Sequence, residues 1–468
     1  MTPLTNTTFD EIKVGQSATI SRTLSQMDIE VLAYTSGDAD AYHLETGQSA
    51  KEVTSTEAVA AQAFFGHLLN RRLPGPGTNI VAANFELRGR LSFGDTVSAT
   101  ITAKEKRTEG ALVVFECQCI NQKGEKVAAG LATVVAPKHH VAYADLAMPE
   151  VIFRRTDVFA QLIETCQHLQ PVKTAVVHPC DHDSLVGPIE AAKRKLILPV
   201  FVGPETRIRA TAESAKVDLG GIEIVPTEHS HAAAEKAVAM ARSGEVEALM
   251  KGSLHTDELM AAVVHSAAGL RTSRRISHVF VLDVPAYPRM LLVSDAAINI
   301  APDLKAKVDI VQNAIDLARV LGIELPRVAI LSAVETVNPE IPSTLDAAAL
   351  CKMAQRGQIN GGLLDGPLAF DNAISELAAK TKKIVSEVAG KTDVLIAPDL
   401  EAGNMLAKQL QYLAGADAAG IVLGARVPIV LTSRADTVRT RLASTAVLVR
   451  VARAKERTAG KGAANALS

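Results

Sequence analysis

Beyond residue 172, short apolar runs alternate with amphipathic segments long enough to form helices. Runs rich in β-branched and aliphatic residues are typical of buried strands, and strand–helix repetition predicts mainly parallel sheets with helices on both faces. So many strands favour two α/β subdomains with a cleft between them over a single sheet. The expected strands are Thr174–His178, Pro199–Gly203, Ile222–Pro226, Ala248–Lys251, Val279–Val284, Leu291–Ser294, Val328–Ala333, Val394–Ala397, Gly420–Leu423 and Val427–Leu431.

The first third of the chain has a different pattern. One apolar-periodic segment, Ser55–Arg72, predicts a long helix, and runs with hairpin signals follow it. This order predicts an α+β domain with an antiparallel sheet. The expected strands are Asn79–Phe85, Thr96–Lys106, Ala111–Ile120 and Val127–Ala136, with a turn at 121–124 before the last. Further upstream, Ser25 and Asp28 have the spacing of a helix capping box.

The change of pattern divides the chain. We expect one domain over residues 1–138, a linker over 139–155 that contains Pro149, and an α/β region over 156–468. The last residues, 461–468, are expected to fray.

The charge balance excludes several classes of function. Lys and Arg total 49 and Asp and Glu total 51, so no overall field exists to attract nucleic acid or an anionic membrane. No run is long enough to span a bilayer, and the start of the chain lacks a signal peptide pattern, so we expect a cytoplasmic protein. Five cysteines without metal-type spacing favour reduced thiols.

The stretch from Val427 to Asp436 carries the strongest chemical signal. A β-branched run ends in a hydroxyl, a guanidinium and a carboxylate, those of Ser433, Arg434 and Asp436, and a helical pattern follows from Thr437. The positive end of a helix favours an anion at such a position. Taken alone, the same residues also fit a simple helix cap with a solvated arginine.

Neighbouring motifs distinguish these alternatives. The segment P-D-L-E-A-G-N, Pro398 to Asn404, precedes Gly415-Ala416-Asp417 and the Ser-Arg pair, and this order resembles the C-terminal part of the phosphate acetyltransferase/phosphate butyryltransferase family. The likeness covers roughly Arg155 to Ala454 and leans toward the butyryl-type branch. It continues through the motifs at residues 249–252, 278–281, 294–303 and 365–369.

The resemblance implies both a fold and a reaction. The fold is a pair of α/β subdomains similar to isocitrate dehydrogenase, with the last helix returning to the first subdomain. The reaction exchanges short-chain acyl groups between coenzyme A (CoA) and inorganic phosphate, so the partners are acyl-CoA, CoA and phosphate or acyl phosphate, with no metal and no tightly bound cofactor. Ser433 then hydrogen-bonds the CoA sulfur, Arg434 counters charge on phosphate and carbonyl oxygens, and Asp436 accepts the proton.

Four further residues are substrate-binding candidates. Asp295, Asn299 and Asn404 belong to the matched motifs and are candidates for shaping the cleft, and Lys251 could bind a phosphate as a point charge. Acetyltransferase members carry an arginine in the helix after the strand of Lys251, whereas residues 257–261 offer none.

A second candidate site lies in the N-terminal domain. After Gly37, a natural helix terminator, Asp38 and His43 fall on one loop. An Asp/His pair can activate water, because histidine supplies a base with a pKa near 6.5. The same spacing also fits a turn stabilised by aspartate side chains.

The pattern S-G-D-x-x-x-x-H, with L-P-G-P-G at 73–77 and F-G-D-T-V at 93–97, resembles the MaoC-type (R)-specific enoyl-CoA hydratases. That family implies a hotdog fold, usually dimeric, in which Asp38 and His43 add water to an enoyl-CoA. The family's Asn and Pro are replaced by Asp40 and Ala41, and its His-Gly-Met by Glu57–Val59. A hydratase of weakened activity and a non-catalytic acyl-CoA-binding or oligomerisation module both remain open.

The combined reading is a fusion of two CoA-thioester domains in one chain that forms a homo-oligomer, a dimer or larger. Two alternative functions remain open. The C-terminal region could be a dehydrogenase on a similar fold, although no nucleotide motif or Mg²⁺-type carboxylate cluster accompanies it. The whole chain could instead be a binding scaffold without a competent site.

Overall fold

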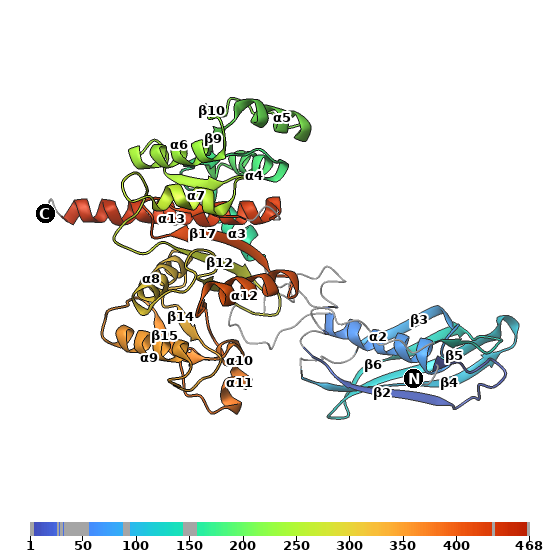
Figure 1. The fold of residues 1–468 in the computed structure, drawn as a ribbon. Coiled ribbons are helices and arrows are strands. Elements are labelled where there is room, and N and C mark those ends of the chain that lie inside the picture. The colour runs from blue at the N-terminus through green and yellow to red at the C-terminus, as the bar shows by residue number, and fades with distance from the viewer. Residues whose placement is uncertain are drawn as a thin grey trace. The chain divides into compact units, whose positions relative to one another are not determined.

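A computed structural model describes residues 4–25, 28, 31, 56–87, 94–143, 157–432 and 436–465, with the backbone alone at 56–61 and 455–465. The chain forms two compact units, Met1–Glu150 and Val151–Ser468 (Figure 1). Among the described residues, no helix is both long and apolar enough to cross a membrane.

The N-terminal unit is built on a five-stranded antiparallel sheet. In spatial order its strands are β2 (Ser17–Thr23), β4 (Thr96–Arg107), β5 (Leu112–Asn121), β6 (Lys126–Val135) and β3 (Asn79–Leu87). The helix α2 (Thr56–Arg71) packs on it, and a 3₁₀ turn, Glu109–Ala111, joins β4 to β5. The α+β expectation with an antiparallel sheet is confirmed, and β2 is a strand that the sequence pattern did not reveal.

One face of this sheet and α2 form the hydrophobic core. Along β4 the inward-facing residues alternate with outward-facing ones, and Val97 and Ile101 are buried. Phe65 of α2 is fully buried, and its ring lies 5.0 Å from that of Phe85. Ser25 and Asp28 cap each other as expected, with the Ser25 N–H donating to Asp28 Oδ2 at 2.9 Å.

Within the expected linker, β7 (Ala142–Tyr143) pairs antiparallel with β1 (Leu4–Thr5). Both Asn6 side-chain atoms reinforce this pairing. Asn6 Oδ1 accepts from the Val141 N–H at 2.9 Å, and Nδ2 donates to the His139 carbonyl at 2.9 Å.

The C-terminal unit contains one sheet of eleven strands. In spatial order they are β10 (Glu223–Pro226), β9 (Ile197–Gly203), β8 (Val172–Val177), β11 (Ala248–Lys251), β18 (Ile429–Val430), β17 (Asp417–Leu423), β12 (Ser277–Asp283), β13 (Leu291–Ser294), β16 (Val394–Ile396), β14 (Arg327–Leu331) and β15 (Leu363–Leu368).

Helices alternate with these strands along the chain (Figure 1). They are α3 (Val158–Cys166), α4 (His182–Lys193), α5 (Glu205–Ala215), α6 (Ser230–Ser243), α7 (Thr256–Val264), α8 (Leu304–Val320), α9 (Pro342–Gln355), α10 (Phe370–Ile374), α11 (Glu376–Thr381), α12 (Leu400–Tyr412) and α13 (Val438–Asn465).

Two parallel sets make up the sheet. Strands β10 to β18 run in one direction, β13 to β15 run in the opposite direction, and the antiparallel strands β17 and β12 join the sets. The expectation that the strands would not form a single sheet is therefore wrong. The ladders of β12 and β17 continue the hydrogen bonding from one set to the other.

The last helix, α13, packs against the first two helices of the unit, α3 and α4. The Cys166 thiol donates to the Ala446 carbonyl at 3.5 Å, and Arg453 pairs with Glu247 at 2.7 Å. Elements that are distant in sequence therefore close the core together.

Candidate functional site

The site is built at the carboxyl ends of two adjacent parallel strands, β11 and β18. Such strand ends are the usual position of ligand sites in α/β sheets, because the backbone leaves the sheet there and exposes polar groups. Met250 pairs with Val430, so Lys251, the last residue of β11, and Thr432, two residues after β18, come close together.

Lys251 is buried, with an exposed fraction of 3%. Its Nζ donates to the Thr432 carbonyl at 3.3 Å and to the Gly252 carbonyl at 3.4 Å. Gly252 allows this turn, because a Cβ at that position would lie 2.3 Å from the Val177 carbonyl oxygen. The chain after β11 therefore passes directly against β8 and holds a cation below the loop after β18.

The reactive stretch follows Thr432. Ser433 and Arg434 lie outside the described residues, whereas Asp436 is described and is half-buried. Along the sequence they fall between a strand and a helix, because β18 ends at Val430 and α13 begins at Val438. The three candidates thus belong to a strand-to-helix connection.

Arg441, in the first turns of α13, is a site residue that the sequence reasoning missed. Its exposed fraction is 1%, and its Nη1 donates to the Thr432 hydroxyl at 2.8 Å. Burial lowers the pKa of the guanidinium, and the carboxylates of Asp181, Asp436 and Asp183 oppose that shift.

Space for this arginine comes from Gly187 of α4, where a Cβ would lie 2.8 Å from Arg441 Cδ. A signal was present in the sequence, because Arg441 falls at helical spacing with Val438, Thr445 and Leu448 and so occupies an apolar face. A charged residue in that register marks a buried cation.

A second polar group follows β13. Both Asp295 oxygens are occupied by its own loop: Oδ1 accepts from the Ala297 N–H at 2.9 Å and the Ile298 N–H at 3.1 Å, and Oδ2 accepts from the Asn299 N–H at 3.0 Å. Asp295 is 2% exposed. This carboxylate orders the loop from within.

Asn299 and Asn404 complete that group. Asn299 Oδ1 accepts from Arg275 Nε at 2.7 Å and its Nδ2 donates to the Ile276 carbonyl at 2.9 Å, while Asn404 Nδ2 donates to the Ala296 carbonyl at 2.9 Å. Gly403 permits the close approach of α12, since a Cβ there would lie 2.2 Å from the Asp295 carbonyl oxygen. The side-chain amides of Asn299 and Asn404 therefore hold the loop after β13 against the neighbouring segments.

His278 of β12 lies between the two groups. It is 1% exposed, and burial lowers the pKa of its imidazole to about 4, although the Asp295 carboxylate acts in the opposite direction. The ring fills the space beside Gly420, where a Cβ would lie 3.0 Å from His278 Nε2 and 2.7 Å from the Leu431 carbonyl oxygen. The neutral ring thus joins the Asp295 loop to the strand end that leads into Thr432.

The structure therefore brings Lys251, Thr432, Arg441 and Asp436 together after β18, and it gathers Asp295, Asn299 and Asn404 after β13, which β17 and β12 separate from β18 in the sheet. The other candidate pair, Asp38 and His43, lies outside the described residues. At Glu57–Val59, the residues compared above with the His-Gly-Met of enoyl-CoA hydratases, only the backbone of α2 is described.

The described part of the chain contains no group of three His, Cys, Asp or Glu side chains able to hold a metal ion. The polar loop from His178 to Asp183 contains the cap of a helix. Asp181 Oδ1 accepts from the Ser184 N–H at 2.9 Å and begins α4.

Comparison with known proteins identifies the C-terminal region. A family model described as phosphate acetyl/butaryl transferase matches residues 227–449. A phosphate acetyltransferase of Rhizobium meliloti is 65% identical over 289 residues, which cover 62% of this chain and 92% of that protein. A phosphate butyryltransferase of Clostridium acetobutylicum is 40% identical over 294 residues, 63% of this chain and 98% of that protein.

A solved structure agrees with these relatives. The branched-chain phosphotransacylase of Enterococcus faecalis V583 aligns with a TM-score of 0.53 and 28% identity, covering 60% of this chain and 99% of that chain. Because relatives well above 30% identity are matched over nearly their whole length, the chain belongs to the phosphate acetyl/butyryl transferase family.

Proposed function

We propose that the C-terminal unit exchanges short-chain acyl groups between CoA and inorganic phosphate at the loop between β18 and α13. The observation that carries this assignment is the pair of buried cations around one residue. Lys251 Nζ contacts the Thr432 carbonyl and Arg441 Nη1 contacts its hydroxyl, and Thr432 immediately precedes Ser433. Burying a cation costs several kcal/mol, which pairing and hydrogen bonds offset only in part, so two buried cations at one residue favour a functional role there.

The reaction needs a positive environment. Phosphate oxygen attacks the thioester carbonyl, the C–S bond breaks, and CoA leaves as a thiolate that takes a proton, giving acyl phosphate and CoA. A thiol with a pKa near 8.5 is mostly protonated at neutral pH, so the reverse direction needs help in forming the thiolate. Cations near the sulfur and the carbonyl oxygen stabilise the charge that develops in both directions.

Each residue of the connection has a role in this proposal. Ser433 hydrogen-bonds the sulfur, Arg434 balances charge on phosphate and the carbonyl oxygen, and Asp436 exchanges the proton with CoA. Lys251 and Arg441 act through Thr432, the residue before Ser433, because Lys251 contacts its carbonyl and Arg441 its hydroxyl. These two cations are therefore positioning residues.

The direct test is phosphate-dependent CoA release from acetyl-, propionyl-, butyryl- and crotonyl-CoA. Arg434→Ala is expected to lower turnover roughly hundreds-fold, about 3 kcal/mol of transition-state stabilisation. Arg209→Ala removes an equal charge from α5, where the side chain is exposed and paired with Glu205, and serves as the matched control. Unaltered turnover in Arg434→Ala contradicts the assignment, and nicotinamide-dependent turnover without CoA release favours a dehydrogenase.

For the N-terminal unit we infer a hotdog domain related to the enoyl-CoA hydratases. One long helix packed on a five-stranded antiparallel sheet supports the inference. Hydration of crotonyl-CoA by the full chain and by Asp38→Asn distinguishes a hydratase from a non-catalytic acyl-CoA-binding or oligomerisation module. A rate that depends on Asp38 favours the hydratase, and light scattering of the same samples tests the expected homo-oligomer.

A further inference from the structure

A polar pocket of about 600 Å³ opens beside the Asp295–Asn299 loop. Four elements line it: the segment Arg271–Ile276, the start of α8, the end of α7 and the loop residues Ile298 and Asn299. Two of them lead back to the proposed reaction centre, because α7 follows Lys251 along the chain and Asn299 belongs to the loop that Asp295 orders.

Two cations of this pocket are exposed and have no internal partner. Neither Arg271 nor Lys305 makes a side-chain hydrogen bond or ion pair in the described part of the chain. A third, Arg275, is held on one side only, where its Nε donates to Asn299 Oδ1 at 2.7 Å. An anchored guanidinium that leaves its terminal N–H groups uncommitted suits an anionic ligand with several oxygens.

The carboxylates of the pocket are already occupied. Asp303 Oδ1 accepts from the Ala306 N–H at 2.8 Å as the cap of α8, and Asp309 Oδ2 accepts from the Arg275 N–H at 2.8 Å. They reduce the positive potential but leave an excess of cations over anions.

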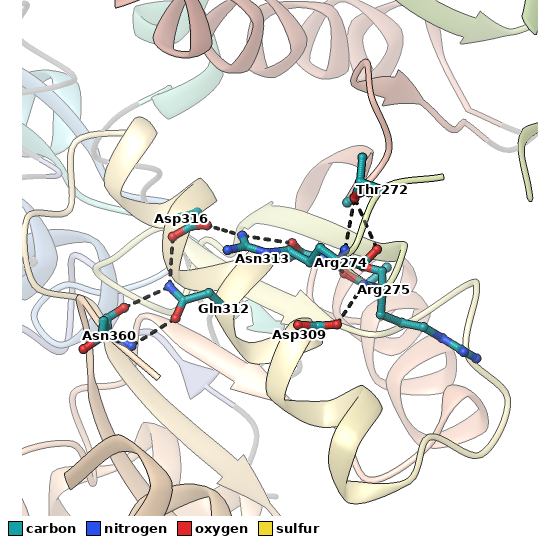
Figure 2. Close-up of polar contacts among 10 residues, drawn as sticks. Thr272, Arg274, Arg275, Asp309, Gln312, Asn313, Asp316 and Asn360 are labelled. Carbon is teal, nitrogen blue, oxygen red and sulfur yellow. Dashed lines mark hydrogen bonds and ion pairs between the residues drawn. The ribbon is translucent and has the colours of Figure 1, made fainter. Parts of the chain in front are cut away.

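Figure 2 shows how the adjacent arginines differ. Arg274 extends along α8 toward Asp316 and Asn313, whereas Arg275 points in the opposite direction. Asp316 neutralises Arg274, which leaves Arg271, Arg275 and Lys305 as the cations available to a ligand.

We propose that this pocket binds the 3′-phosphorylated adenosine diphosphate end of CoA. The assignment depends on the proposed acyl transfer and extends it, because it separates the handle of the carrier from its reacting sulfur. Several phosphate groups on one ligand match three cations spread over Arg271, Arg275 and Lys305, and the pantetheine arm then runs past the Asp295 loop toward Thr432. The reacting inorganic phosphate binds elsewhere, at the β18–α13 connection.

The kinetic test uses the double variant Arg271→Ala/Lys305→Ala of the full chain with acetyl-CoA and with S-acetylpantetheine, which lacks all three phosphates. The KM for acetyl-CoA is expected to rise about tenfold or more, while kcat/KM for S-acetylpantetheine and the KM for phosphate match those of the wild type. Lys352→Ala/Arg356→Ala, which removes two exposed cations from α9 and its end, is the matched control and is expected to behave as the wild type.

Three outcomes overturn the assignment: an unchanged KM for acetyl-CoA, an equal loss with S-acetylpantetheine, or a raised KM for phosphate in place of that for acetyl-CoA. The last outcome assigns the pocket to the reacting phosphate.

Calorimetry with adenosine 3′,5′-bisphosphate separates this inference from the proposed function. The wild type and the α9 control are expected to bind this probe, and Arg271→Ala/Lys305→Ala is expected to bind it at least tenfold more weakly. Binding lost in the variant upholds the pocket even where the wild type shows no acyl transfer, whereas equal binding by variant and wild type rejects it even where acyl transfer is fast.

Discussion

Among the described residues, the N-terminal unit buries three polar side chains, Asn6, Thr8 and Asn121, and none is charged. The C-terminal unit buries charged side chains as well, including Lys251 and Arg441. Uncharged polar groups can be satisfied by turns and caps at little cost, whereas a buried charge costs several kcal/mol. The core of the N-terminal unit therefore serves stability alone, whereas the core of the C-terminal unit is less stable than it could be because it contains buried charges.

The largest effect is expected from a change in the first core. Phe65→Ala should lower the free energy of unfolding of the N-terminal unit by about 3–5 kcal/mol, because a fully buried ring leaves a cavity. Acyl transfer should not change, since the cluster around Phe65 contains residues of the N-terminal unit alone. Urea unfolding and CoA release measure the two, with the exposed Val14→Ala as control. Loss of acyl transfer in Phe65→Ala would contradict the separate roles of the two cores.

Arg441→Met tests the second core. The variant keeps an unbranched chain in place of the aliphatic part of arginine but leaves the Thr432 hydroxyl without its donor, so turnover should fall about a hundredfold, ~2.7 kcal/mol. Because Arg441 acts through Thr432, the KM for acyl-CoA should change less than kcat, and Arg441→Lys should recover part of the rate. A variant with normal kcat removes Arg441 from the site.

Gly187→Ala disturbs the space around Arg441 without removing its charge. The added methyl group meets Arg441 Cδ at 2.8 Å, so the side chain has to shift, at a cost of about 2 kcal/mol in the free energy of unfolding. A smaller fall in kcat than in Arg441→Met is expected, measured in the same assay. Wild-type stability would mean that the space beside α4 is larger than the structure shows.

The smallest effect is a pH dependence. The unfolded chain protonates His278 near pH 6.5, but in the folded chain burial lowers its pKa to about 4, so the unfolded state binds more protons between these values. Stability is thus lost as the pH falls, by about 1.4 kcal/mol from pH 7.5 to pH 5.5. His278→Leu should remove this part of the slope. Equal slopes of the urea midpoint in variant and wild type contradict it.

Much of the fold could be predicted from local pattern. The strands β11 and β13 match their predicted bounds, and α2 differs by one residue at each end. The strand β15 was missed because Gly366 and Pro367 signal a turn, yet an edge strand tolerates proline. The single continuous sheet could not be predicted, because the pairing of β12 with β17 joins segments far apart in sequence.

The candidate site, too, could be predicted from the sequence only in part. Motif order selected Lys251, Asp295, Asn299 and Asn404 as candidates. The structure places Lys251 at the end of β11, Asp295 and Asn299 in the loop after β13, and Asn404 in α12. The roles of the amides and of the carboxylate depend on partners in other segments, such as the Ala296 carbonyl for Asn404. Burial of Arg441 depends on Gly187 of a distant helix, so the space for this side chain could not be predicted from the residues around Arg441.

The position of α13 has a consequence for biosynthesis. Because this helix packs on α3 and α4 and follows every other element of its unit, the groove it fills stays open until the ribosome has made nearly the whole unit. The connection that carries Ser433 and Arg434 leaves the ribosome with that helix. Nascent chains therefore expose an apolar groove until α13 has been made.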